Sequence, residues 1–217
     1  MAVIRPEPTG REIKLDPNEI IMSKTDKKGI IEYANDYFMQ ICGYEEHELM
    51  GEPHNCIRHP LMPKIVFKIL WHRLHAKKNI HAIVINLAKN GSHYWVITDF
   101  DFKVDEDGEI RAIYSRRRAA TQKSIDFFGP LYKKLCEIEE KRGMDGSWKY
   151  LLGYLEEEQI TLDDLVLKLN GGFDGKSKEV KKTLAEKLKE NEKVEDVKEL
   201  MDKAVEKKGF FKRLFGG

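Results

Sequence analysis

Four side chains in the first half of the chain have types and spacing suited to holding a ligand. Phe67 and Trp71 lie four residues apart in a stretch with helical periodicity, so they can form one aromatic wall. Asn86 interrupts the apolar run IVINL, and a buried amide there needs a hydrogen-bond partner. Arg58 offers a guanidinium fork for a phosphate or a carbonyl edge. No acid–base or nucleophile constellation accompanies them, so we expect a binding protein rather than an enzyme.

Each of these residues also has a plainer interpretation. Trp71 could be ordinary core on an amphipathic helix, and Asn86 could pair with backbone at a β-bulge. Arg58 could form a surface ion pair, which would contribute little. Four other histidines are expected to be surface or structural residues: His72, His75, His81 and His93.

Composition excludes several classes of function. The chain has 217 residues, and its 38 basic and 37 acidic side chains leave a net charge of +1, which gives no support for nucleic-acid binding. Cys42, Cys56 and Cys136 are far apart and form no CxxC pair, which argues against a disulfide framework or a zinc site and for a reducing compartment. No apolar run approaches the roughly 20 residues that span a bilayer. We therefore expect a cytoplasmic protein.

Residues 19–118 mix strand and helix signals. The expected strands are residues 19–23, 30–33, 80–88, 93–103 and 110–115, joined in part by turns at 26–29, 89–91 and 105–108. Between the second and third strands we expect a helix capped by Asn35 or Asp36 and ended by Gly43, a short helix, a polar loop at 54–60 and a longer helix starting at Pro63. This order predicts an α+β fold with a five-stranded antiparallel sheet and helices on one face.

After residue 118 the pattern becomes wholly helical. We expect Pro130 to kink or restart a helix, Ser147 to cap the next one, and Thr161 with Asp164 to cap a third that ends at Gly171. From residue 176 on, a narrow apolar stripe between many Lys and Glu residues indicates a solvated or partner-seeking helix pair. The expected organisation is an N-terminal arm (1–18), a sensor domain (19–118), a helical transmitter (119–172) and charged helices with a basic-aromatic tail (173–217).

An ordered set of short motifs over residues 19–118 resembles the PAS domain of the aerotaxis-receptor (Aer-like) family. Short words such as KNG are weak alone, but their order over about a hundred residues is specific. The motifs are Pro53-His54-Asn55, Arg58-His59-Pro60, Met62-Pro63, Leu70-Trp71, Lys89-Asn90-Gly91 and His93-Tyr94-Trp95-Val96.

The resemblance implies a PAS fold that holds FAD noncovalently and reads redox or oxygen status for energy taxis. The cofactor-binding residues that it implies are Arg58, His59, Trp71 and Asn86, then Asn35 and Phe67, with His54 as a further candidate. A flavin ring needs apolar walls, an amide for its polar edge and positive charge for its phosphates or its reduced ring, and these residue types supply them.

Several positions depart from the family's pattern. Leu61, Ile85, Leu87 and Ile80 stand where the family usually has charged residues or tryptophan, and all four changes are toward apolar side chains. They remove charges that could hold a dinucleotide's polar tail. A b-type haem with His59, His54 or His72 as axial ligand is therefore an alternative, and a cofactor-free PAS dimerisation module is a second one.

Signal output is expected to go through protein contact. The resemblance implies a chemotaxis receptor or kinase complex as partner, and we expect a homodimer. The tail segment at 207–215 mixes bases with aromatics, which suits weak peripheral contact with the inner face of the membrane; a disordered tail is the alternative.

Overall fold

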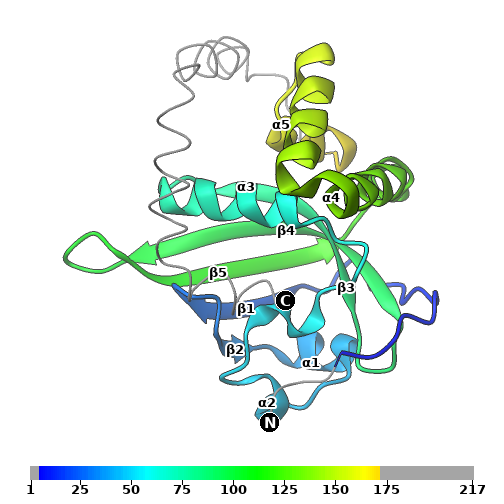
Figure 1. Cartoon of the computed structure of the whole chain (residues 1–217). Helices are drawn as coiled ribbons and strands as arrows, with labels where there is room; N and C mark the ends of the chain where they lie inside the picture. The colour runs from blue at the N-terminus through cyan, green and yellow to red at the C-terminus, as the bar shows by residue number, and fades with distance from the viewer. Residues whose placement is uncertain (1–4, 172–217) are drawn as a thin grey trace.

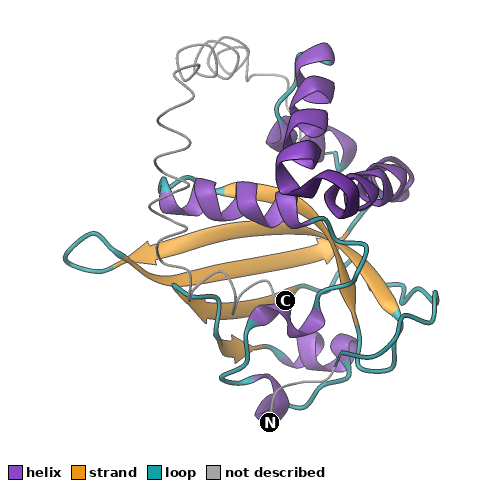
Figure 2. Ribbon diagram, in the orientation of Figure 1, coloured by secondary structure: helices purple, strands orange, loops and turns teal. Residues whose placement is uncertain are grey.

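The computed structural model describes residues 5–171. Its centre is one antiparallel five-stranded sheet in the order β2-β1-β5-β4-β3. The strands are β1 (Ile21–Asp26), β2 (Ile31–Ala34), β3 (Ile80–Leu87), β4 (His93–Val104) and β5 (Ile110–Ala119). Figure 2 shows these strands as one continuous curved sheet with helices on both sides of it. The expected α+β fold and its five strands are confirmed.

Local sequence signals explain the first hairpin and the helix that follows it. Asp26 Oδ1 accepts hydrogen bonds from the backbone of Lys28 and Ile30 at 2.7 and 2.9 Å, and this closes the turn between β1 and β2. Helix α1 (Asp36–Cys42) begins after Asn35, whose side chain accepts from Phe38 N. Its C-terminal glycine adopts the left-handed conformation, as expected.

Three further helical segments cover the inner face of the sheet, which we define as the face that carries Asn86. They are α2 (Glu46–Leu49), the 3₁₀ helix η1 (His54–Ile57) and α3 (Lys64–His75). The loop expected at 54–60 therefore starts as one helical turn. Helix α3 buries Ile65, Val66, Leu70 and Leu74, so its apolar stripe faces the sheet.

The outer face of the sheet is covered by helices α4 (Gln122–Glu157) and α5 (Leu162–Leu169). Because strand residues alternate between faces, Ile83 and Ile85 of β3 point away from Asn86. On that side the Trp95 ring stacks on Tyr132 of α4 with ring centroids 6.1 Å apart. In Figure 1, α4 and α5 lie on the side of the molecule away from α1 and α2.

Helix α4 does not restart at Pro130, and Ser147 does not cap a helix. The backbone leaves the helical conformation at Gly143 (φ 68°) instead. Pro130 and Asp126 are both exposed, so the Asp126 carbonyl, which loses its helical hydrogen bond at Pro130, can bind water instead. Ser147 lies beyond the break and inside the helix, and its hydroxyl donates to Met144 O at 2.9 Å and to Glu139 at 3.2 Å. Thr161 caps α5 as expected, accepting from Asp164 N.

The arm expected at residues 1–18 is extended where it is described, and it follows the start of β4. His93 exchanges backbone hydrogen bonds with Arg11 and Ile13 at 2.8 and 2.7 Å. Gly91 in the β3–β4 turn has φ 79°, and a Cβ there would lie 2.4 Å from the Glu7 carbonyl oxygen. The turn therefore requires glycine both for its conformation and for the close approach of the arm.

Candidate ligand cavity

A cavity lies between α3, η1 and the inner face of the sheet. Its free volume is about 80 Å³, and it is partly open to solvent. Five of the seven cofactor candidates from the sequence line it: His54, Arg58, Phe67, Trp71 and Asn86.

One wall of the cavity combines aromatic rings with a cation. Phe67 and Trp71 come from the same face of α3, and the Arg58 guanidinium lies 4.6 Å from the centre of the Phe67 ring. Arg58 Nη2 also donates to Met62 O at 2.7 Å, which fixes the side chain against the start of α3. Burial lowers the pKa of Arg58 to about 10, so it stays charged at neutral pH. Arg58 is therefore a charged side chain fixed in position at the cavity, and the alternative of a surface ion pair does not apply.

Asn86 presents an open hydrogen-bonding group. Its side chain is 3% exposed, and the β3–β4 pairing runs through it in regular register, so no bulge accounts for the amide. Within residues 5–171, neither Asn86 Nδ2 nor the adjacent Tyr94 hydroxyl has a hydrogen-bond partner. Burial raises the pKa of that hydroxyl well above its usual value, and the Arg117 charge, followed by the Asn86 amide, offsets only part of the rise. A buried amide left open costs about 1–3 kcal/mol, which a polar ligand edge would relieve.

A further cationic residue, Arg117, was not among the candidates from the sequence; it lines the cavity from β5 and is 3% exposed. Its Nη1 donates to Ser23 Oγ at 3.0 Å, and its Nη2 lies 2.7 Å from His54 Nε2. The local sequence SRRRA is typical of a solvent-exposed basic surface. Strand alternation was the signal that could have found it, because Ile113, Ser115 and Arg117 share one face.

His54 is held neutral beside this arginine. Burial, and then the charge of Arg117, lower the pKa of His54 to about 3. Because a guanidinium can only donate, His54 Nε2 must be the acceptor, and the ring proton is on Nδ1. The ring also stacks on Phe38 with centroids 5.7 Å apart.

Three other candidates lie outside the cavity lining. Asn35 is occupied structurally, since its Oδ1 accepts from Met22 N and Phe38 N and its Nδ2 donates to Ile20 O. His59 is buried, and its Nδ1 accepts from Leu61 N at 3.1 Å. His72 is on the exposed side of α3.

The cavity wall is tied to the helices that follow the sheet. Pro63 provides no side-chain cap for α3, and the Glu139 carboxylate of α4 takes that place, accepting from Lys64 N and Ile65 N at 2.8 Å each. A movement of the α3 wall is thereby coupled to α4 through two charge-assisted hydrogen bonds.

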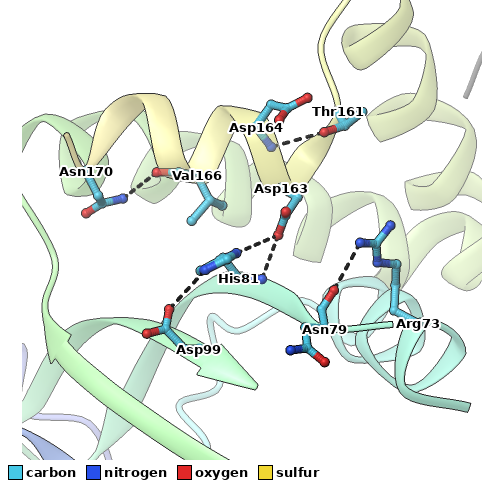
Figure 3. Close-up of polar contacts among 9 residues, drawn as sticks. All are labelled: Arg73, Asn79, His81, Asp99, Thr161, Asp163, Asp164, Val166 and Asn170. Carbon is cyan, nitrogen blue, oxygen red and sulfur yellow. Dashed lines mark hydrogen bonds and ion pairs between the residues drawn. The ribbon is translucent and has the colours of Figure 1, made fainter. Parts of the chain in front are cut away.

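A second polar junction joins β3 to α5 (Figure 3). Asp163 Oδ1 accepts from His81 N at 2.7 Å and lies 3.1 Å from His81 Nδ1. On its other side, His81 Nε2 lies 3.3 Å from Asp99 of β4. The hydrogen bond to Asp163 raises the pKa of His81. The imidazole therefore bridges the sheet and α5. His81 was expected to be a surface or a structural residue, and its role here is structural.

The described part of the chain offers no set of three or more His, Cys, Asp or Glu side chains arranged to hold a metal ion. No helix within residues 5–171 is long and apolar enough to cross a bilayer. The charged helices and the basic-aromatic tail expected after residue 176 lie outside the described residues.

Comparison with known proteins gives a consistent result. Residues 31–116 match the PAS fold family. The chain is 42% identical over 130 residues to the aerotaxis receptor of Escherichia coli K12, which covers 60% of this chain and 26% of the receptor. It is 28% identical over 90 residues to the bacterioopsin transcriptional activator of Halobacterium salinarum, covering 42% of this chain and 13% of that protein.

Among solved structures, the light state of the blue-light photoreceptor Aureochrome1 LOV aligns with a TM-score of 0.46 at 14% identity, covering 51% of this chain and 88% of that one. The chain spans about a quarter of the length of the aerotaxis receptor that it matches. On the family match and the five-stranded architecture together, residues 31–116 belong to a PAS domain, and the chain is similar in sequence to the aerotaxis receptor.

Proposed function

We propose that the PAS domain binds FAD noncovalently in the cavity and reports redox or oxygen status by contact with a signalling protein. The observation that carries the proposal is the open, buried amide of Asn86 between an aromatic wall and two guanidinium groups. A flavin has a flat apolar body, a donor–acceptor edge and phosphates, and each of these features meets a matching group here.

Different residues would contact different parts of the flavin. Phe67 and Trp71 supply the flat apolar wall, Asn86 supplies the donor for a carbonyl edge, and Arg58 supplies positive charge beside the wall. A bound flavin would bring reversible redox chemistry, and the protein's part is to orient it and set its electrostatic surroundings. Asn35 and His59 support the fold around the cavity instead.

The output path proposed here runs through α4 and α5. Glu139 holds the first turn of α3, Tyr132 donates to Ile83 O of β3 at 2.6 Å, and Asp163 binds His81. A change in the cavity wall can therefore reach helices that face away from it. A chemotaxis receptor or kinase complex is the partner proposed for this cytoplasmic module, with a second copy of the chain as a dimer partner.

The structure gives no specific support to haem. His54 Nε2 is occupied by Arg117, His72 is exposed, and His59 lies outside the cavity lining. Thus none of the three proposed axial ligands directs an open ring nitrogen into the cavity.

An absorption spectrum of the purified protein, before and after anaerobic dithionite, tests the proposal. We expect the paired flavin bands in the wild type, bleaching on reduction. Trp71→Ala and Asn86→Ala should each weaken flavin retention by about tenfold or more, which corresponds to about 1.4 kcal/mol. His72→Ala, on the exposed side of α3, is the matched control and should retain the colour.

Two outcomes would contradict the flavin proposal. A Soret band would assign the cavity to haem. Colourless protein that stays colourless after incubation with excess FAD and then haemin would leave a cofactor-free PAS module.

A further inference from the structure

Arg117 is a buried cation without a counter-charge. Within residues 5–171 it forms no ion pair with a carboxylate, although it is 3% exposed. Arg58, the other cavity arginine, is in a different position, because the negative charge of Glu139 acts on it. Buried charges in proteins are normally paired, so the isolation of Arg117 needs a physical reason.

The groups around Arg117 are neutral. Its two hydrogen-bond partners are a hydroxyl, Ser23 Oγ, and a neutral imidazole, His54 Nε2. Its Cζ lies 5.6 Å from the centre of the Phe38 ring, which offers a weak cation–π contact. These contacts hold the guanidinium in place at the β1–β5 end of the cavity, and none of them cancels its charge. An exposed surface arginine would not need such support.

The charge cannot be removed by deprotonation. Burial lowers the pKa of Arg117 to about 10, which still leaves it charged at neutral pH. His54 cannot share the charge, since a second cation beside Arg117 is disfavoured. The cavity thus has a fixed positive group on β5, positioned by contacts with β1 and η1.

We propose that Arg117 is the charge-selective group of this cavity and holds a ligand, or a redox form of a ligand, that presents negative charge at the β1–β5 end. For a flavin this inference rests on the function proposed above. The charge then comes either from a ring that carries an added electron or from a phosphate. In the first case Arg117 stabilises the reduced form over the oxidised form; in the second it stabilises both forms equally.

Flavin affinity and midpoint potential in Arg117→Gln test the inference, with Arg116→Gln, the exposed neighbour on β5, as matched control. If the ring carries the charge, a tenfold loss of preference for the reduced form lowers the potential by about 59 mV for one electron. If a phosphate carries it, affinity falls about tenfold or more and the potential stays constant. Arg117→Lys should recover part of either effect. Wild-type affinity and potential in Arg117→Gln would overturn the inference and leave the flavin proposal intact.

A second measurement does not depend on flavin. Thermal unfolding of the ligand-free protein is followed in inorganic phosphate and in chloride at equal ionic strength. We expect phosphate to raise the Tm of the wild type and of Arg116→Gln, and not that of Arg117→Gln. If the wild type binds no flavin but shows this difference, the flavin proposal fails and the anion site stands. Absence of both flavin and the phosphate effect would refute the anion site as well.

Discussion

His54 and His81 belong to the same sheet-and-helix framework, but their surroundings have opposite electrostatic effects. His54, in the cavity, is paired with a cation, and its pKa falls to about 3. His81, at the β3–α5 junction, lies between two carboxylates, and its pKa rises. The first histidine keeps an arginine charge uncancelled, whereas the second lies where charges compensate one another (Figure 3).

The contrast separates the region proposed to bind a ligand from a structural one. In the cavity, the Asn86 amide and the Arg117 charge are left open, at a cost to the stability of the ligand-free protein. At the junction, Asp163 satisfies both a backbone donor and a ring donor of His81. In the cavity, an unpartnered amide and an uncompensated charge both belong to residues that line space open to a ligand.

The largest expected effect is at the junction. Asp163→Ala leaves the His81 backbone N–H without its acceptor and removes one of the two charges around the ring, so we expect a loss of about 2–3 kcal/mol in the free energy of unfolding. Chemical denaturation measures this loss. Asp164→Ala is the control, because it removes a charge from the same helical turn without touching His81. Equal losses in the two variants would reduce the junction to a helix-dipole effect.

A smaller effect is expected where α4 holds the cavity helix. Glu139→Gln removes the charge and leaves one acceptor oxygen, so only one of the two donors, Lys64 N or Ile65 N, keeps its hydrogen bond. This should cost about 1–2 kcal/mol in stability. Denaturation and hydrogen exchange at the first turn of α3 are the measurements, with exposed Glu140→Gln as control. Unchanged exchange at Ile65 would show that Glu139 does not couple the two helices.

The smallest effect is the pH dependence that distinguishes the two histidines. Since the folded pKa of His81 is raised above 6.5, its contribution is fully present below pH 6.5 and is lost as pH rises through the folded value. Asp99 and Asp163 favour the charged ring, and Arg118 of β5 opposes it. The free energy of unfolding of the wild type should exceed that of His81→Asn by an amount that decreases as pH rises. We expect the decrease to be less than about 1 kcal/mol. If the stability difference between the wild type and His81→Asn increases above pH 6.5, the raised pKa of His81 is contradicted.

His54 should behave in the opposite sense. Its contribution is present above pH 6.5 and is lost as pH falls toward its folded pKa of about 3, since the unfolded chain takes up the proton first. NMR titration of the ring resonances can check both histidines: His81 should titrate above 6.5, and His54 should remain neutral at pH 5.

Local patterns in the sequence were sufficient for most of the fold. Asn35 and Thr161 cap helices as expected, because a cap depends on residues within one turn. The Asn86 signal also placed a cavity residue, since an amide in an apolar strand is informative by itself. Whether Asn86 and its neighbours hold FAD stays a prediction, as do the domain boundaries.

The features that the sequence did not predict depend on partners far away in the chain. Glu139 caps a helix that begins 75 residues earlier, and no local pattern marks it as a cap. Arg117 looked like one of three surface arginines, and its burial depends on Ser23 and His54. Pro130 is the opposite case, since here a local signal was misleading. The helix continues through this residue because solvent exposure makes a local helix breaker tolerable.

The free edge of β3 is closed at three points by the chain itself. Arg58 forms a bridge with Asn86, Tyr132 Oη donates to Ile83 O, and Asp163 accepts from His81 N. Exposed, a strand with the sequence IVINL would be a template for strand addition by another chain. Helices α4 and α5 thus also protect against aggregation, and any signalling motion that lifts them has to leave this edge covered or offer it to a specific partner.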